Sequence, residues 1–321
     1  MTDDLLTVAD LEVEIAGEPI LTDVSLRVSP GEILGIVGES GSGKTITSKV
    51  LTGMLGPIGA RLAGGTVSFA GRDLTTLDER DWRQIRGHKI SLIPQGSQSA
   101  LDPLMNVRKQ MVETVEALSG AEDADARSLE LLESVRLDPS ERLLRAYPHE
   151  LSGGMRQRVM IALALAGDAE ILIGDEATTA LDVTVQSEIL KLLGRLRDER
   201  GLALILITHD FGVVRGLADS VSVMYAGATV ETGSTAEVLS RPRHPYTAAL
   251  LGAQPRGVHQ DERLTSIAGS PPAPSEWPVG CRFAPRCRYS VQVCNEGQPP
   301  MRPYASGHDT ACARAEELGD L

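Results

Sequence analysis

The segment ILGIVGESGSGKT, residues 33–45, decides the fold of this chain. Its apolar first half predicts a buried strand, and a helix is expected to start near Gly43. Residues 38–45 fill every required position of the phosphate-loop pattern G-x4-G-K-S/T, between that strand and that helix. The glycine-rich turn points consecutive backbone N–H groups into one concave site, to which the helix N-terminus adds positive potential. The segment therefore predicts a site for the β- and γ-phosphates of a nucleotide.

Two side chains of this loop carry most of its chemistry. Lys44 supplies a full positive charge to the phosphate oxygens, and Thr45 supplies a hydroxyl for Mg²⁺. The alternative is a flexible Gly/Ser turn before a helix, which the Lys-Thr pair and the flanking elements disfavour. The expected nucleotide-binding residues here are Gly38, Ser40, Gly41, Ser42, Gly43, Lys44 and Thr45.

A second apolar strand, residues 171–174, delivers two carboxylates at its end, Asp175 and Glu176. The carboxyl ends of parallel strands are where open α/β sheets bind ligands. We expect Asp175 to hold Mg²⁺, directly or through water, and Glu176 to take a proton from the attacking water or to orient it. An acid pair after an apolar strand is by itself more often the start of a solvated loop, so this interpretation depends on the remaining motifs.

The chain alternates strand and helix patterns over some 200 residues, which predicts an α/β fold with a mostly parallel sheet covered on both faces. Residues 5–37 read as strands, and so do residues 66–71, 89–95 and 202–207. Residues 104–151 have a helical pattern, and residues 221–233 read as a hairpin around Gly227. After about residue 241, spaced prolines indicate a small, loop-rich extension.

Length and composition bound the class of protein. With 321 residues and 42% hydrophobic residues, the chain can bury a sizeable core. Its apolar runs are far shorter than the ~20 residues of a membrane-spanning helix, and its first residues are acidic where a signal peptide is basic. We therefore expect a cytoplasmic protein. A net charge of −13 gives no general attraction to nucleic acid.

Residues 151–158, LSGGMRQR, closely resemble the LSGGQ signature of ATP-binding-cassette ATPases. Other motifs of that family occur in the expected order along the chain: Gln95 after a strand, the stretch TALD at residues 179–182, and His209 at the end of the strand at residues 202–208. The resemblance covers residues 5–240. It implies a P-loop, RecA-like core with an antiparallel β subdomain and an inserted helical subdomain, at about residues 96–165.

The resemblance also implies roles for these residues. Two cassettes sandwich two ATP molecules, so that Ser152, Gly153 and Gly154 of one subunit cap the γ-phosphate held by the other. A helix N-terminus with glycine N–H groups suits that task. His209 would contact the γ-phosphate, Gln95 would sense Mg²⁺ or the water, and Asp182 would connect the two sites. The family generally stacks adenine on an aromatic ring, which residues 14–18 lack.

Within the family, the chain looks most like the ATPases of oligopeptide and dipeptide importers. The resemblance lies in residues 151–165, 178–186 and 241–251, and in GCRFAPRCRYSVQVC at residues 280–294. It implies a nucleotide-binding domain at residues 1–240, an extension at 241–321, and a peripheral position on the cytoplasmic face of the membrane. The implied partners are two transmembrane permease subunits, an extracytoplasmic solute-binding protein and a second ATPase. Met155 resembles the first ATPase of such pairs, which favours a heterodimer.

All four cysteines, Cys281, Cys287, Cys294 and Cys312, lie in the last 41 residues, which suggests one shared site. Their spacing, C-x5-C-x6-C-x17-C, differs from paired C-x2-C zinc knuckles, and the importer resemblance implies a 4Fe-4S cluster. Three alternatives stay open: a Zn²⁺ site, in which His308 could replace one cysteine; unoccupied thiols; and a disulfide formed on oxidation.

Two other functions compete with transport. A soluble cassette ATPase acting on nucleic acid or ribosomes usually carries coiled-coil insertions, paired cassettes or basic arms, and the sequence contains none of these. A non-hydrolysing regulatory cassette is disfavoured because Glu176 and His209 are both present. The transported cargo is not encoded in this chain, since a binding protein and permeases would select it.

Overall fold

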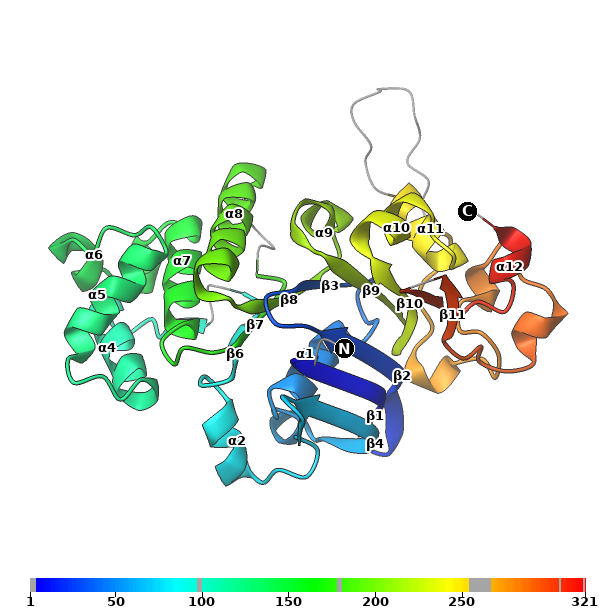
Figure 1. Ribbon diagram of the computed structural model, residues 1–321, viewed down its shortest axis with the longest axis horizontal. Coiled ribbons are helices and arrows are strands. Elements are labelled where there is room, and N and C mark those ends of the chain that lie inside the picture. Colours follow the sequence, from blue (N-terminus) through cyan, green and yellow to red (C-terminus); the bar gives the residue numbers. More distant parts are fainter. Residues whose placement is uncertain (1–3, 97–99, 178–180, 254–266, 306, 320) are drawn as a thin grey trace.

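The computed structural model describes residues 4–96, 100–177, 181–253, 267–305, 307–319 and 321. Their strands form an eight-stranded and a four-stranded sheet, with helices gathered at both ends of the larger sheet (Figure 1). Thr179 and Ala180, from the predicted stretch after Glu176, lie outside the described residues.

The larger sheet has the strand order β11-β12-β10-β9-β3-β8-β7-β6. Its strands are β3 (Ile33–Val37), β6 (Ile90–Ile93), β7 (Ile171–Asp175), β8 (Ala203–Thr208), β9 (Ser220–Tyr225), β10 (Ala228–Ser234), β11 (Arg302–Ala305) and β12 (His308–Thr310). Neighbouring strands from β6 through β7, β8 and β3 to β9 pair in parallel. Strands β3, β7 and β8 are buried along their whole length, which explains their continuous apolar sequences. The predicted mostly parallel sheet is confirmed.

The smaller sheet is antiparallel throughout, with the order β2-β1-β4-β5. Its strands are β1 (Leu6–Ile15), β2 (Glu18–Val28), β4 (Ala60–Phe69) and β5 (Arg72–Asp73). Leu11 and Val24 of this sheet share one buried cluster with Ile36 of β3 and Leu51 of helix α1 (Lys44–Leu51). The phosphate-loop helix is therefore packed into the core that joins the two sheets. The short helices η1 (Gly56–Ile58) and α2 (Glu79–Ile85) follow in the same half of the chain.

A group of helices lies beyond β6 and β7 (Figure 1). It comprises α4 (Val107–Leu118), α5 (Ala124–Ser134), α6 (Glu141–Arg145), η2 (Pro148–Glu150), α7 (Gly153–Ala164) and α8 (Val183–Arg200). Side chains of Asn106, Asp123, Ser152 and Asp182 accept hydrogen bonds at the N-termini of α4, α5, α7 and α8. Apolar residues of all four helices share one buried cluster with β7 and β8. The helical pattern predicted for residues 104–151 is confirmed.

Helix α9 (Phe211–Leu217) contacts β3 and β8 and lies over the middle of the large sheet (Figure 1). The other elements lie toward the opposite end of that sheet: α10 (Thr235–Ser240), α11 (Pro245–Gly252), η3 (Pro274–Glu276), η4 (Ala284–Arg286), η5 (Gln292–Asn295) and α12 (Ala315–Leu318). The hairpin predicted around Gly227 is formed by β9 and β10, and Gly227 has a φ of 81°. The loop-rich extension predicted after about residue 241 also contributes a strand to the large sheet, because β12 pairs with β10.

Among the described residues, no helix combines the length and apolar composition that crossing a bilayer requires.

Candidate functional site

The phosphate loop connects β3 to α1 and takes a shape that only glycine permits at several positions. Gly41 and Gly43 have φ values of 79° and 103°, in the left-handed region. A Cβ on Gly38 would lie 2.2 Å from the backbone oxygen of Met224 and 2.6 Å from Oγ of Ser42. The loop also rests on the β9–β10 hairpin, where the N–H of Gly227 donates to the carbonyl of Ser42 over 3.0 Å. The backbone of the loop is thus fixed by close packing.

Lys44 lies against this loop with 5% of its surface exposed. Its Nζ donates to the carbonyl oxygens of Gly38, at 2.8 Å, and of Glu39, at 2.9 Å. Burial lowers the pKa of Lys44, while the carboxylates of Glu176, Asp175 and Glu39 act in the opposite direction. An ammonium group with so little exposure to solvent is strongly stabilised by a phosphate oxygen beside it.

Asp175, at the end of β7, lies beside the first turns of α1. Its Oδ1 accepts from the hydroxyl of Thr45 at 3.4 Å, and its Oδ2 accepts from that of Ser48 at 3.0 Å. Burial raises the pKa of Asp175 above its usual value, against the hydrogen bond from Ser48. Ser48 could not be identified from the sequence, because its contact with Asp175 depends on which face of α1 meets β7.

The oxygens of Thr45 and Asp175 fit Mg²⁺ by their chemistry, because this ion prefers hard oxygen ligands. Across the described ranges, however, no group of three or more His, Cys, Asp or Glu side chains is placed to hold a metal ion. A protein site for Mg²⁺ commonly has one or two carboxylates and is completed by substrate phosphates and water. The geometry therefore fits an ion that arrives with a nucleotide.

Glu176 is contacted by residues from the ends of the two strands that flank β7. Nε2 of Gln95, after β6, donates to Oε2 of Glu176 over 2.8 Å. Nδ1 of His209, after β8, lies 3.5 Å from Oε1 of the same carboxylate. Glu176 itself has a φ of 50°, an unfavourable conformation for a non-glycine residue of the kind found at functional sites. The structure thus brings together the three residues predicted to act in catalysis.

The LSGGM segment lies with the helices and not with the phosphate loop (Figure 1). Oγ of Ser152 accepts from the N–H of Met155 at 3.2 Å and so caps α7. A Cβ on Gly153 would meet the side chain of Leu181 at 3.3 Å, and one on Gly154 would meet Val185 at 2.9 Å. Asp182 caps α8 by accepting from the N–H of Val185 at 2.9 Å. These four residues therefore form a second group, separate from Lys44 within one chain.

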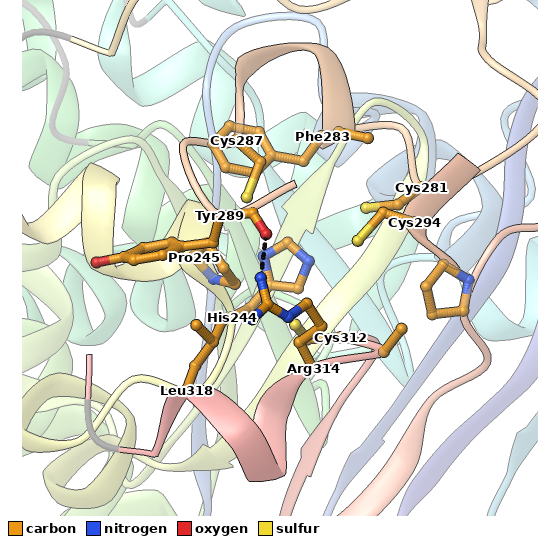
Figure 2. Close-up of a pocket in the computed structure, with 13 residues that line it drawn as sticks. His244, Pro245, Cys281, Phe283, Cys287, Tyr289, Cys294, Cys312, Arg314 and Leu318 are labelled. Carbon is orange, nitrogen blue, oxygen red and sulfur yellow. Dashed lines mark hydrogen bonds between the residues drawn. The ribbon is translucent and has the colours of Figure 1, made fainter. Parts of the chain in front are cut away.

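The four cysteines line a single cavity, into which Figure 2 shows their side chains extending. All four are free thiols. Burial raises the pKa of Cys281 and of Cys287, and it raises the pKa of Cys312 to about 11. By its chemistry, the set of four thiols fits a thiolate-bound centre. In the described part of the chain, however, no three or more of the His, Cys, Asp or Glu side chains are placed to hold a metal ion. His308 does not line this cavity, and its Nε2 lies 2.8 Å from the buried carboxylate of Glu231.

Comparison with known proteins assigns the family. Residues 21–179 match the ABC transporter family model, and residues 230–294 match the model for the C-terminal region of oligopeptide/dipeptide transporters. The probable peptide ABC transporter ATP-binding protein y4tR of Sinorhizobium fredii is 45% identical over 99% of this chain and 97% of its own length. The chain belongs to the ATP-binding-cassette transporter family. It is an ATP-binding subunit of that family and an ATPase.

Other relatives agree with this assignment. The oligopeptide transport ATP-binding protein OppD of Salmonella typhimurium is 43% identical to this cassette over 98% of the chain and 95% of its own length. A solved dimer of the ATP-binding cassette MJ0796, in a post-hydrolysis state bound to ADP and Pi, is 28% identical, with a TM-score of 0.63. It covers 72% of this chain and 98% of its own. The cassette fold expected from the sequence is confirmed.

Proposed function

We propose that this cassette hydrolyses ATP to energise the import of peptides or similar small solutes through a membrane transporter. The observation that carries the proposal is the combination of two features in one chain. Lys44, Asp175 and Glu176 are gathered at the ends of β3 and β7, and residues 230–294 match the oligopeptide/dipeptide transporter C-terminal region. Relatives similar over nearly the whole chain are named as peptide or oligopeptide transport proteins, which supports the same cargo class.

In the proposed reaction, the loop from Gly38 to Thr45 binds the β- and γ-phosphates through its N–H groups and Nζ of Lys44. Thr45, Asp175 and Gln95, together with water, would hold Mg²⁺, which would neutralise negative charge on the phosphates. A water oxygen attacks the γ-phosphorus, and the bond between the γ-phosphorus and the bridging oxygen of ADP breaks. Glu176 takes the proton of the attacking water, which leaves ADP and phosphate. His209 contacts the γ-phosphate and helps Glu176 hold the water.

The second half of each ATP site comes from another cassette. Ser152, Gly153 and Gly154 start a helix of 12 residues, so their N–H groups form an anion site of the same kind as the phosphate loop. Within one chain this anion site lies away from Lys44, and a partner cassette would bring its own copy to the γ-phosphate. Asp182, at the start of α8, would connect the two sites. A heterodimer with a sister cassette is the form that we propose.

The same proposal covers the rest of the assembly. Two transmembrane permease subunits and an extracytoplasmic solute-binding protein would complete the transporter, with this chain peripheral on the cytoplasmic face. Residues 1–240 would form the nucleotide-binding domain, with a helical subdomain at about 96–165, and residues 241–321 would form the extension. A net charge of −13 supports a function without nucleic acid.

For the four-cysteine cavity we propose a 4Fe-4S cluster held by Cys281, Cys287, Cys294 and Cys312, with Zn²⁺ as the alternative. What supports it is the set of four free thiols on one cavity, in a part of the chain that otherwise builds little core. Bound there, the group would link three segments of the extension, namely the loop 281–287 and the segments that carry Cys294 and Cys312. Anaerobic purification followed by absorption spectroscopy and iron and sulfide analysis tests this assignment. Colourless protein with one zinc ion per chain would overturn the cluster.

The import function is tested by deleting the gene and measuring uptake of labelled di- and oligopeptides by the cells. Uptake should be lost and should return with the intact gene but not with the Glu176→Gln variant. Peptide uptake that persists undiminished in the deletion strain contradicts the proposed cargo class. In that case the purified chain should still hydrolyse ATP with its partner cassette, which would separate a wrong cargo from a wrong activity.

A further inference from the structure

The C-terminal part of the chain, residues 241–321, contacts the phosphate loop at Glu39. The guanidinium of Arg286 donates to both carboxylate oxygens of Glu39, from Nη1 at 2.7 Å and from Nη2 at 3.1 Å. The backbone N–H of Glu39 donates to the hydroxyl of Tyr246 over 2.8 Å. The carbonyl oxygen of Glu39 accepts from Nζ of Lys44 and from the N–H of Ser42, at 2.9 and 3.2 Å. Glu39 therefore joins the C-terminal contacts directly to the residue that binds phosphate.

The side chain of Arg286 is held in one well-defined position. Its side chain is 5% exposed, and the two parallel hydrogen bonds to Glu39 fix both its distance and its orientation. The other N–H groups donate to the carbonyls of Ala268 and Gly269 and to the hydroxyl of Tyr225, at 2.8, 3.2 and 3.3 Å. All five donors of the guanidinium are thereby satisfied, so the side chain has one strongly preferred position.

The segment that carries Arg286 also carries two of the cysteines. Residues 281–287 form a tight loop in which the N–H groups of Ala284, Arg286 and Cys287 donate to carbonyls within the same segment. Phe283 of this loop is 3% exposed. Its ring packs against Tyr225 and Tyr246, with ring centroids 5.3 and 5.4 Å apart. The same two tyrosines offer the hydroxyls that hold Arg286 and Glu39.

We propose that Arg286 is a positioning residue for ATP binding, which acts through Glu39 to hold the phosphate loop in its binding shape. Nucleotide affinity then depends on the conformation of residues 281–287, although these residues lie outside the phosphate loop. This inference goes beyond the proposed function, because it concerns the nucleotide affinity of the chain and not its cargo.

The proposal is tested by measuring the dissociation constant of the full-length chain for the Mg²⁺ complex of a fluorescent, non-hydrolysable ATP analogue. Arg286→Ala should raise this constant about five- to tenfold, and Arg286→Lys, which keeps the charge but loses the paired geometry, should have an intermediate effect. Because Arg286 acts through Glu39, adding Arg286→Ala to Glu39→Ala should have little further effect. Arg288→Ala changes an exposed arginine two residues away, which donates to the hydroxyl of Tyr289, and should leave the affinity unchanged.

A matched control separates positioning from simple attachment of the C-terminal part. His308→Ala also loosens that part, because it removes the contact with Glu231, but it leaves Glu39 and Arg286 untouched. The proposal predicts that His308→Ala lowers the melting temperature with little change in nucleotide affinity. Equal losses of affinity in His308→Ala and Arg286→Ala would overturn it, as would wild-type affinity in Arg286→Ala or effects of Arg286→Ala and Glu39→Ala that multiply. Should Arg286→Ala fail to fold, Arg286→Lys supplies the same comparison.

Discussion

The side-chain amide of Gln95 donates to Oε2 of Glu176 over 2.8 Å, so residues 81 positions apart meet at the edge of the sheet. Strands β6 and β7 are parallel neighbours, and β8 follows on the other side of β7. Their carboxyl ends therefore deliver Gln95, Glu176 and His209 to one place. The carboxylate has one oxygen near an amide and the other near an imidazole, an arrangement that limits its rotation.

This arrangement predicts the behaviour of Glu176→Gln. The change removes the proposed proton acceptor but keeps the size of the side chain and leaves the phosphate loop intact. ATP turnover should fall by roughly 10²- to 10⁴-fold, with nucleotide affinity within about twofold of wild type. Phosphate release and analogue binding, measured with the partner cassette present, check the two parts. Glu170→Gln, an exposed carboxylate paired with Lys89, is the matched control and should hydrolyse normally. Undiminished turnover in Glu176→Gln would show that another group takes the proton.

Ser152 allows the structural and the proposed catalytic role of one side chain to be separated. Its hydroxyl caps α7 at the N–H of Met155, so Ser152→Ala should cost about 1 kcal/mol of stability. Ser152→Asp keeps a capping oxygen and should melt close to wild type. It should nevertheless abolish ATP hydrolysis in the proposed dimer, because the added carboxylate would face and repel the γ-phosphate of the partner site. Melting curves and ATPase rates of both variants check this. Normal hydrolysis by Ser152→Asp would place α7 away from the nucleotide.

The sequence was informative wherever the chemistry depends on neighbouring residues. The phosphate loop, the buried strands and the hairpin at Gly227 follow from patterns of a few residues, and the structure has all of them. The acid pair 175–176 could be assigned only because the other motifs of the family follow in the expected order along the chain.

Contacts between distant segments could not be predicted in this way. Strand β12 has three residues, and its pairing with β10 joins Thr310 to Glu231 without any periodic pattern. Ser48 and Arg286 act through partners 127 and 247 positions away, Asp175 and Glu39. A serine in a helix or an arginine in a loop has no local feature that identifies such a partner.

Glu231 is the most buried of the carboxylates that hold the C-terminal part, with no exposed surface. It accepts from the N–H of Arg243 at 2.6 Å, from that of His244 at 3.1 Å and lies 2.8 Å from Nε2 of His308. Glu231→Ala removes this acceptor from three donors at once and should cost at least about 3 kcal/mol. Thermal unfolding and limited proteolysis check the loss. The control is Glu237→Ala, an exposed glutamate on α10, which should change stability by less than about 0.5 kcal/mol. Equal melting temperatures for the two variants would contradict the proposed role of Glu231 in holding the C-terminal part.

In the reduced, metal-stripped chain, the cysteine cavity should protect Cys312 from alkylation. Burial raises the pKa of Cys312 from 9.0 to about 11. The thiolate is the reactive form, so at pH 8 its fraction is about 0.001 in the folded chain and about 0.1 in the unfolded chain. Alkylation of Cys312 by iodoacetamide should therefore be about 100-fold slower in the folded chain and should rise about tenfold per pH unit up to pH 9.

Mass spectrometry of the peptide that contains Cys312, sampled over time at pH 7, 8 and 9, measures these rates in native buffer and in guanidinium chloride. The sign follows from the raised pKa: the folded chain keeps the proton on Cys312 more tightly than the unfolded chain does. Between about pH 9 and pH 11 the unfolded state therefore loses this proton first, so the contribution of Cys312 to stability should decline as the pH rises through that window. Equal alkylation rates in both buffers would show that Cys312 is not protected by burial. A metal or cluster bound in the cavity should slow alkylation of Cys312 further, because the sulfur would then be occupied as a ligand.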